Sequence, residues 1–205
     1  MVRGFACYLR TIDPATEIPP TGILLHRKRY AIPYLYSDQE IERLLSEAAA
    51  LTPPLRAATF HTLIGLLAVA GMRIGEALRL DRADVDLDAG VLTIRLTKLG
   101  KSRQLPLHPS TVHALGRYDR QRDELCPRPN APSCFMSTRG GRLEKSGVQK
   151  VFRGLRRRAG LDRPRGSPKP RLHDLRHSFA VRTVIDWHRT GADAQARMLW
   201  LSTYI

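Results

Sequence analysis

The longest apolar run of the chain covers residues 63–71 and contains no polar or charged side chain. A helix that is apolar on every side has to be buried among the other elements of a folded domain. The run is far shorter than the roughly 20 apolar residues that a membrane-spanning helix needs. It therefore predicts a buried helix. The 205 residues of the chain are enough for one sizeable core, with little room for a second complete domain.

The chain is strongly basic. It has 34 Lys and Arg residues against 19 Asp and Glu, a formal net charge of +15, and 42% apolar residues from which to build a core. This combination is typical of folded nucleic-acid-binding proteins. A basic chain can also coat an anionic membrane, but this one has no long basic amphipathic helix, no lipidation signal and no signal-peptide core. We therefore expect a cytoplasmic protein that binds nucleic acid and no membrane.

The cysteine pattern does not indicate a metal site or a disulfide framework. Cys7, Cys126 and Cys134 are odd in number and widely spaced, and they form no Cys-x-x-Cys pair. We expect reduced and mostly buried thiols, with neither a bound metal nor a cofactor.

Most of the expected elements are helices. Apolar residues at helical spacing predict helices at 2–9, 38–48, 55–70, 110–124, 147–159 and 173–188, another that starts at 73, and a short one after 191. The helix from residue 38 follows a capping box, Ser-Asp-Gln-Glu, at residues 37–40. Gly71 separates two helices and is expected to form a tight turn between them.

Two short segments alternate in the manner of strands. Residues 91–96 form one strand and residues 103–107 its hairpin partner, with a basic tip of sequence Thr-Lys-Leu-Gly-Lys-Ser at residues 97–102 between them. Pro106 places the partner at the edge of the sheet, and residues 134–136 are expected to add a short third strand. The elements together predict an α+β fold that is mostly helical with a small antiparallel sheet.

Residues 153–171 carry eight basic residues and only one acid, Asp162. A run of this kind is ordinarily a solvated surface. Here we favour contact with DNA phosphates, because the run leads directly into His173.

The chemistry of the chain is concentrated in two short stretches. His173 and Arg176 lie three residues apart on a predicted helix, so both side chains share one face and can address one phosphate. A guanidinium presents a fork of donors that matches phosphodiester oxygens, and a second one is available from Arg73. Taken singly, Arg73 is equally a surface residue paired with Glu76, and His173 a helix cap or a core histidine. The joint pattern favours a phosphate site over these readings.

The two stretches, Gly-Met-Arg-Ile-Gly-Glu-Ala-Leu at 71–78 and His-Asp-Leu-Arg-His-Ser-Phe-Ala at 173–180, resemble the arginine boxes of the tyrosine recombinase, or phage integrase, family. The resemblance implies a recombinase catalytic domain that integrates or recombines duplex DNA through a 3′-phosphotyrosyl intermediate, without ATP, metal or a small-molecule substrate. It assigns catalytic roles to Arg73 and Arg176. His173 becomes a base or hydrogen-bond donor, and Glu76 orients Arg73 and its helix.

The family also uses a lysine on a β-hairpin tip as general acid to the leaving 5′-oxygen. The predicted tip matches that position. The resemblance therefore implies Lys98 as the acid, with Lys101 in reserve. The alternative for either lysine is a simple contact with the DNA backbone. His177 is turned about 100° away from Arg176 on the helix, and we expect it to be structural.

The resemblance also predicts the organisation of the chain. It implies a last helix of a core-binding domain at 1–12, a Pro-rich linker at 13–30 and a catalytic domain at 31–205 that stops before the family's Leu-Gly-His box and nucleophilic tyrosine. Tyr204 is expected not to be the nucleophile, because the segment around it looks like the one that runs into that box.

Two functions remain open on this basis. One is a recombinase whose tyrosine comes from a longer product or from a partner subunit. The other is an inactive remnant that occupies DNA, or the sites of a full-length recombinase, without cutting. Enzymatic activity is therefore left undecided. Double-stranded DNA is the expected partner in both cases, together with further copies of the chain or a full-length recombinase.

Overall fold

The computed structural model describes residues 2–20, 32–95, 102–164, 167 and 169–204. The chain divides into two compact units, residues 1–32 and residues 33–205. The first unit contains helix α1 (Val2–Arg10), which matches the expected helix, followed by turns and an irregular segment. Within this unit the guanidinium of Arg3 donates a hydrogen bond to the carbonyl of Pro19. Most of the apolar stripe of α1, including Val2 and Phe5, is exposed.

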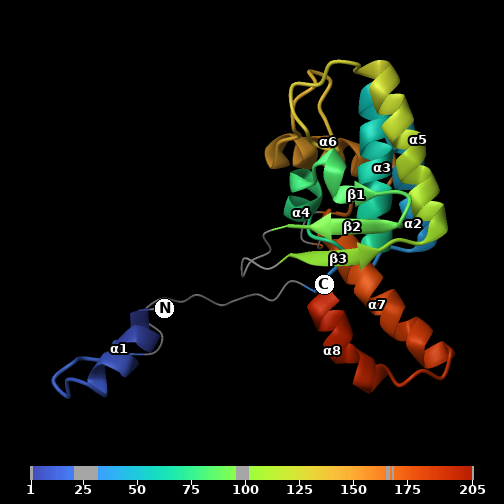
Figure 1. Cartoon of the computed structure of the whole chain (residues 1–205). Coiled ribbons are helices and arrows are strands. Elements are labelled where there is room, and N and C mark those ends of the chain that lie inside the picture. The colour runs from blue at the N-terminus through green and yellow to red at the C-terminus, as the bar shows by residue number, and fades with distance from the viewer. Residues whose placement is uncertain (1, 21–31, 96–101, 165–166, 168, 205) are drawn as a thin grey trace. The chain divides into compact units, whose positions relative to one another are not determined.

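The second unit contains the remaining elements, which Figure 1 labels. In chain order they are α2 (Asp38–Ala49), α3 (Pro54–Ala70), α4 (Ile74–Arg79), the 3-10 turn η1 (Arg82–Asp84), β1 (Val85–Asp86), β2 (Val91–Ile94), β3 (Arg103–Pro106), α5 (Pro109–Leu125), α6 (Lys145–Arg158), α7 (Asp174–Arg189) and α8 (Ala194–Tyr204). The predicted α+β fold with a small antiparallel sheet is confirmed.

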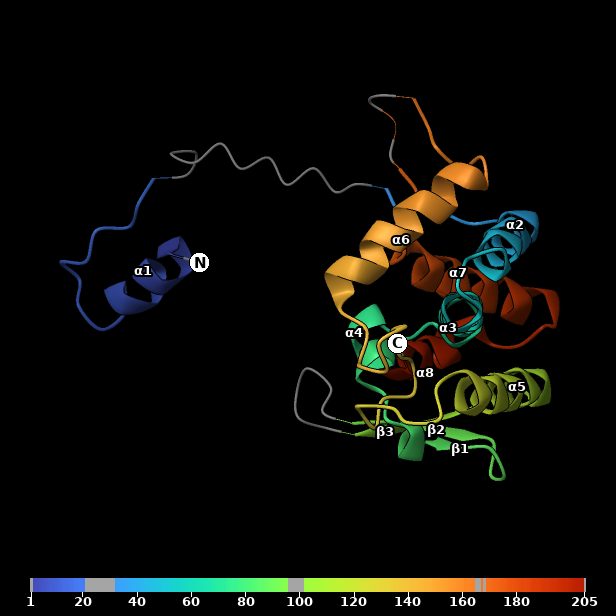
Figure 2. The ribbon, with the colours of Figure 1, turned by 90° about the horizontal axis from the view of Figure 1, so that it is seen from above.

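Helix α3 is the centre of this unit. It contacts α2, α5 and α7, and Figure 2 shows it nearly end-on with these helices around it. Leu63, Ile64, Leu66 and Leu67 are each at most 2% exposed, because partners cover the helix on several sides. The prediction of a buried helix from the apolar run is therefore confirmed. Val69 is its one open apolar side chain, at 54% exposure.

The sheet has the order β1-β2-β3, and all its pairs are antiparallel. Strand β2 pairs with β3 in the predicted hairpin, and the strand that contains Pro106 lies at the edge as expected. The predicted third strand at residues 134–136 is wrong, since β1 takes that place. The segment from 134 to 136 is instead buried in the core, where the Phe135 ring stacks on Tyr118 at 5.5 Å between centroids.

Local signals at the helix ends are confirmed in detail. The Ser37 hydroxyl oxygen accepts a hydrogen bond from the Glu40 backbone N–H, and the Glu40 carboxylate accepts one from the Ser37 backbone N–H. Together they form the predicted capping box. Gly71 ends α3 with φ of +57°, a left-handed conformation that a residue without Cβ adopts at little cost.

Helix α7 belongs to the core at its beginning and leaves it towards its end. Its buried residues, Asp174, Leu175, Arg176 and Ser178, all lie in the first turns. Figure 1 shows the rest of α7 extending away from the body of the unit, with α8 returning beside it. Within the described ranges, no helix is long and apolar enough to cross a membrane.

Candidate active site

The two arginine-containing stretches meet at the turn after α3. Arg176, on the first turns of α7, is 8% exposed and donates from one terminal nitrogen to the carbonyl oxygen of Gly71 at 2.7 Å. The ring of Phe179 lies so close to Gly71 that a Cβ on this glycine would come within 2.2 Å of it. The turn therefore fits against α7 because of both its left-handed backbone and its missing side chain.

Arg73 is the N-cap residue directly before α4. Its backbone N–H donates to Glu76 Oε2 at 2.8 Å, and its guanidinium donates to Glu76 Oε1 at 3.1 Å. A carboxylate at this position also compensates the positive end of the helix dipole. The Arg73 side chain is 46% exposed, whereas that of Glu76 is 3% exposed. Glu76 thus lies beneath Arg73 and holds it from the protein side, as the sequence led us to expect.

A third arginine, to which the sequence analysis gave no role, completes the cluster. Arg103, the first residue of β3, donates to both oxygens of Glu76, at 3.2 Å to Oε1 and 3.0 Å to Oε2. A basic residue at the start of a hairpin strand is a weak signal, since most such residues are exposed. Only the packing of β3 near α4 reveals the contact.

Glu76 stays ionised in this environment. Burial by itself raises the pKa of a carboxyl group. The hydrogen bond from the Arg73 backbone and the two from Arg103 outweigh burial, and the pKa of Glu76 lies below its ordinary value. One negative charge is therefore fixed among three arginines.

The positive charges in the cluster oppose one another. Burial, together with repulsion from Arg73 and Arg103, lowers the pKa of the Arg176 guanidinium to about 10, and Glu76 acts against this shift. Arg176 remains charged at neutral pH. Three arginines and one glutamate leave an excess of two positive charges, a setting that favours a bound anion.

His173 lies at the exposed rim of the same helix start. Its ring meets the ring of His177 edge-on, with 4.9 Å between the centroids. Partial burial of the ring, with smaller contributions from His177 and Arg176, lowers the pKa of His173 below its ordinary value. The imidazole is therefore neutral at pH 7 and can accept a proton.

The fourth predicted site residue is Lys98. Lys98, like Lys101, falls outside the described residues, so the structure does not place it. Strand β3 begins five positions after Lys98, and Arg103 at its start belongs to the cluster.

The basic run at 153–171 is in part internal to the protein. Arg156 is buried, donates to Asp162 Oδ1 at 2.8 Å and to the carbonyl of Pro170 at 3.1 Å. Arg171 pairs with Asp174 at 3.0 Å. Arg157, at 79% side-chain exposure, is more open to solvent. Arg158 also pairs with Glu47, at 2.7 Å. Several members of the run therefore contact other parts of the fold, and phosphate contact remains a prediction for the exposed ones.

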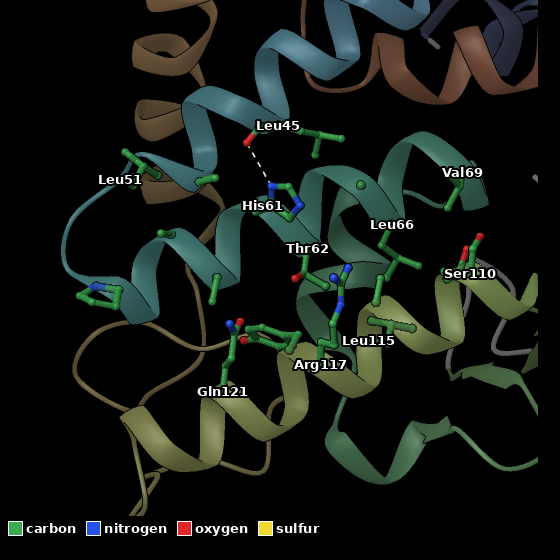
Figure 3. A pocket seen from close by; sticks show the side chains of 18 of the residues that line it. Leu45, Leu51, His61, Thr62, Leu66, Val69, Ser110, Leu115, Arg117 and Gln121 are labelled. Carbon is green, nitrogen blue, oxygen red and sulfur yellow. Dashed lines mark hydrogen bonds between the residues drawn. The ribbon is translucent and has the colours of Figure 1, made fainter.

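An apolar groove of about 680 Å³ lies between α2, α3 and α5. Figure 3 shows Leu45, Leu66, Val69 and Leu115 on its walls and the Arg117 side chain extending from α5 toward α3. None of the cluster arginines, and neither His173 nor His177, lines it. The arginine cluster therefore lies outside this groove, and Arg73, at 46% side-chain exposure, is its most open member.

Comparison with known sequences shows to which family the chain belongs. The sequence profile described as "Phage integrase family" matches residues 34–187, which include both arginine boxes and the segment between them. The chain belongs to the phage integrase family. The tyrosine recombinases are its members, and the expectation drawn from the two boxes is confirmed.

Individual phage integrase relatives agree. The chain is 46% identical over its full length to a protein of Sinorhizobium fredii named as integrase/recombinase y4rB, 67% of which it covers. It is 32% identical over 95% of its length to the tyrosine recombinase XerC of Roseiflexus, and covers 59% of that protein. The chain thus spans about three fifths to two thirds of the length of these integrase relatives.

A solved structure shows the same integrase fold. The crystal structure of the XerH site-specific recombinase bound to a palindromic difH substrate, a post-cleavage complex, aligns with 98% of this chain and 59% of its own, with a TM-score of 0.65 and 23% identity. At this identity the likeness concerns the fold. It supports the second unit as a tyrosine recombinase catalytic fold.

Proposed function

We propose that the chain binds duplex DNA and acts in site-specific recombination or integration, as the catalytic part of a tyrosine recombinase. The observation that carries the proposal is the cluster in which Arg73 and Arg176 come together around Glu76, from two boxes about a hundred residues apart. Two guanidinium groups with an excess of positive charge suit a scissile phosphate, whose negative charge grows as phosphorus becomes five-coordinate.

The proposed reaction follows from these roles. The oxygen of a tyrosine hydroxyl attacks the phosphorus, and the hydroxyl proton passes to a base, for which His173 is the candidate. The bond from phosphorus to the 5′-oxygen breaks, and Lys98 gives its proton to the departing 5′-oxygen. Arg73 and Arg176 stabilise the transition state, and His173 accepts or donates a hydrogen bond at the reacting phosphate. The reverse attack by a 5′-hydroxyl rejoins the strand and releases the tyrosine. No ATP, metal or other cofactor is needed for these steps.

The tyrosine is not assigned to any residue of the 205. We propose that it is supplied from a longer product or from another subunit on the same DNA, with residues 1–12 as the end of a core-binding domain, 13–30 as a linker and 31–205 as the catalytic domain. Further copies of the chain, or a full-length recombinase, are the proposed protein partners. The proposed compartment is the cytoplasm, where bacterial DNA lies.

Salt dependence of DNA binding tests the first part of the proposal. A labelled duplex is titrated with the protein at several salt concentrations, and the slope of log affinity against log salt is measured. Each phosphate contact contributes roughly −0.9 to the slope. A steep negative slope is expected. A flat salt dependence, or no binding at low salt, would contradict the proposal.

Covalent capture separates an active recombinase from an inactive DNA-binding remnant. Nicked duplexes that trap the 3′-phosphotyrosyl product are incubated with the chain, and a DNA-linked protein band is sought on a denaturing gel. The 205-residue chain alone is expected to give no band, because the phosphate meets no positioned tyrosine. A band that disappears in Tyr204→Phe would show instead that Tyr204 is the nucleophile.

A further inference from the structure

We propose that Arg103 is a positioning residue of the recombinase site, which holds Glu76 so that Glu76 in turn presents Arg73 to the phosphate. The inference rests on the proposed function, and it concerns a residue that neither the family resemblance nor the comparisons assign. The relevant geometry is the sharing of one buried carboxylate by two arginines.

Arg103 itself is committed to the protein. Its side chain is 18% exposed, and both terminal nitrogens donate to the two oxygens of Glu76. Such a two-point contact between guanidinium and carboxylate fixes the plane of both groups. The Arg103 side chain is less than half as exposed as that of Arg73, so a phosphate that approaches from solvent meets Arg73 first. Arg103 therefore acts through Glu76 and not on the DNA.

Arg73 is held less completely than Arg103. Only one of its terminal nitrogens donates to Glu76, and nearly half of its side chain is exposed. The remaining donors of its guanidinium are available to a ligand. Arg103 already donates to both oxygens of Glu76. These bonds compete with a second hydrogen bond from the other terminal nitrogen of Arg73. Without Arg103, this competing donor to the Glu76 oxygens is removed, and Arg73 turns inward to complete its own two-point contact.

The contact between Arg103 and Glu76 leaves one buried N–H of Arg103, the Nε–H, without an acceptor among the described residues. A buried donor without an acceptor is unfavourable. A lysine would carry the same charge without this donor, but it has no fork to span both oxygens of Glu76. Arg103→Lys therefore separates the geometry of the contact from its charge.

The experiment follows the Arg73 and Arg176 side-chain Nε–H signals of the ¹⁵N-labelled full chain by NMR, during titration with inorganic phosphate. In the unsubstituted protein both signals are expected to shift with a common affinity. In Arg103→Lys we expect the affinity reported by Arg73 to fall about tenfold, the scale typical of an outer residue that orients a ligand-binding one. The Arg73 side chain should also become less mobile in relaxation measurements, which a uniform loss of stability would not cause.

Arg156→Lys is the matched control. Arg156 has a 10% exposed side chain and a similar contact with a carboxylate, that of Asp162, but no place in the cluster. Its substitution should leave the phosphate affinity unchanged. Glu76→Gln provides a second route, since it removes the intermediary while Arg103 stays in place. It should give the same loss, and adding Arg103→Lys to it should change the affinity by less than about twofold.

The outcomes are distinct. Unchanged affinity and mobility of Arg73 in Arg103→Lys would overturn the inference. A further tenfold loss on adding Arg103→Lys to Glu76→Gln would also overturn it, because Arg103 would then bind phosphate directly. If phosphate shifts neither Arg73 nor Arg176 in the unsubstituted protein, the phosphate site of the proposed function fails, and the inference falls with it.

Discussion

Arg176 donates a 2.7 Å hydrogen bond to the carbonyl oxygen of Gly71, a residue 105 positions earlier in the chain. The acceptor belongs to the turn that ends α3, and Arg73 follows two residues later. The first arginine box is thus placed by the same backbone that receives the second. A change in the packing of this turn is therefore expected to change the geometry of the proposed phosphate site.

Gly71→Ala should destabilise the protein strongly. The new Cβ would lie 2.2 Å from the Phe179 ring, and the backbone has a positive φ. Overpacking and the strained backbone together are expected to cost about 2–4 kcal/mol of the free energy of unfolding. Urea unfolding followed by circular dichroism measures this.

Gly154→Ala is the control for this substitution. Gly154 lies within α6, and a Cβ there would meet only the end of the Arg158 side chain, at 3.7 Å. Alanine in a helix interior is favoured over glycine by roughly 0.5–1 kcal/mol, so this variant should be as stable as the parent or slightly more so. A Gly71→Ala protein of parental stability would show that the turn and α7 are not packed as described.

Glu76→Gln should lower the free energy of unfolding by about 3 kcal/mol at pH 7, because it leaves buried arginines without their counter-charge. The pKa of Glu76 is lowered in the folded protein, so its contribution is present above the unfolded value of about 4.3 and is lost as pH falls through the folded pKa. The two proteins should therefore converge in stability in acid. Denaturant unfolding from pH 7 to pH 3 checks this, with the exposed Glu124→Gln as control. A constant difference across the range would contradict it.

His173 should titrate below the ordinary histidine pKa of about 6.5. Since its folded pKa is depressed, the unfolded state takes up a proton first, and this group reduces stability as pH falls from about 6.5 to the folded pKa. In His177→Gln the pKa of His173 should rise only in part, because burial remains the larger cause. Two-dimensional NMR of the ring signals measures both values. An unchanged pKa in the variant would remove His177 from the account.

Lys98→Ala should impair cleavage far more than DNA binding, in a recombination-competent form of the protein. A substrate with sulfur in place of the leaving 5′-oxygen needs little protonation, so it should largely restore cleavage by the variant. Rates on the two substrates are compared in single-turnover assays. Equal losses on both would make Lys98 a backbone contact and bring Lys101 forward as the acid.

Much of the fold could be predicted because its signals are local. The capping box at Ser37, the glycine turn at Gly71 and the apolar periodicity of α3 each depend on a few neighbouring residues. The error at residues 134–136 has the opposite origin. Three apolar residues in a row suit a strand and a buried irregular segment equally well, and only the stacking of Phe135 on Tyr118 decides between them.

The candidate site also contains residues that local motifs indicate and residues that only long-range contacts reveal. Arg73, His173 and Arg176 could be proposed from the sequence because they lie in two short motifs. Arg103 was missed because its partner, Glu76, is 27 positions away and on another element. Arg156 was misread for a related reason, since its charge suggested phosphate whereas its fold contact is Asp162.

Tyr36 joins the beginning of the second unit to α7 through both of its backbone polar groups. Its N–H donates to Ser178 Oγ and its carbonyl accepts from Arg182, each at 2.8 Å. Ser178 and Arg182 lie one helical turn apart on α7, so both hydrogen bonds hold the same segment of the chain. A mechanical pull on the chain from the N-terminal side is therefore carried in part by the helix that contains Arg176, together with the core in which the Tyr36 side chain is buried.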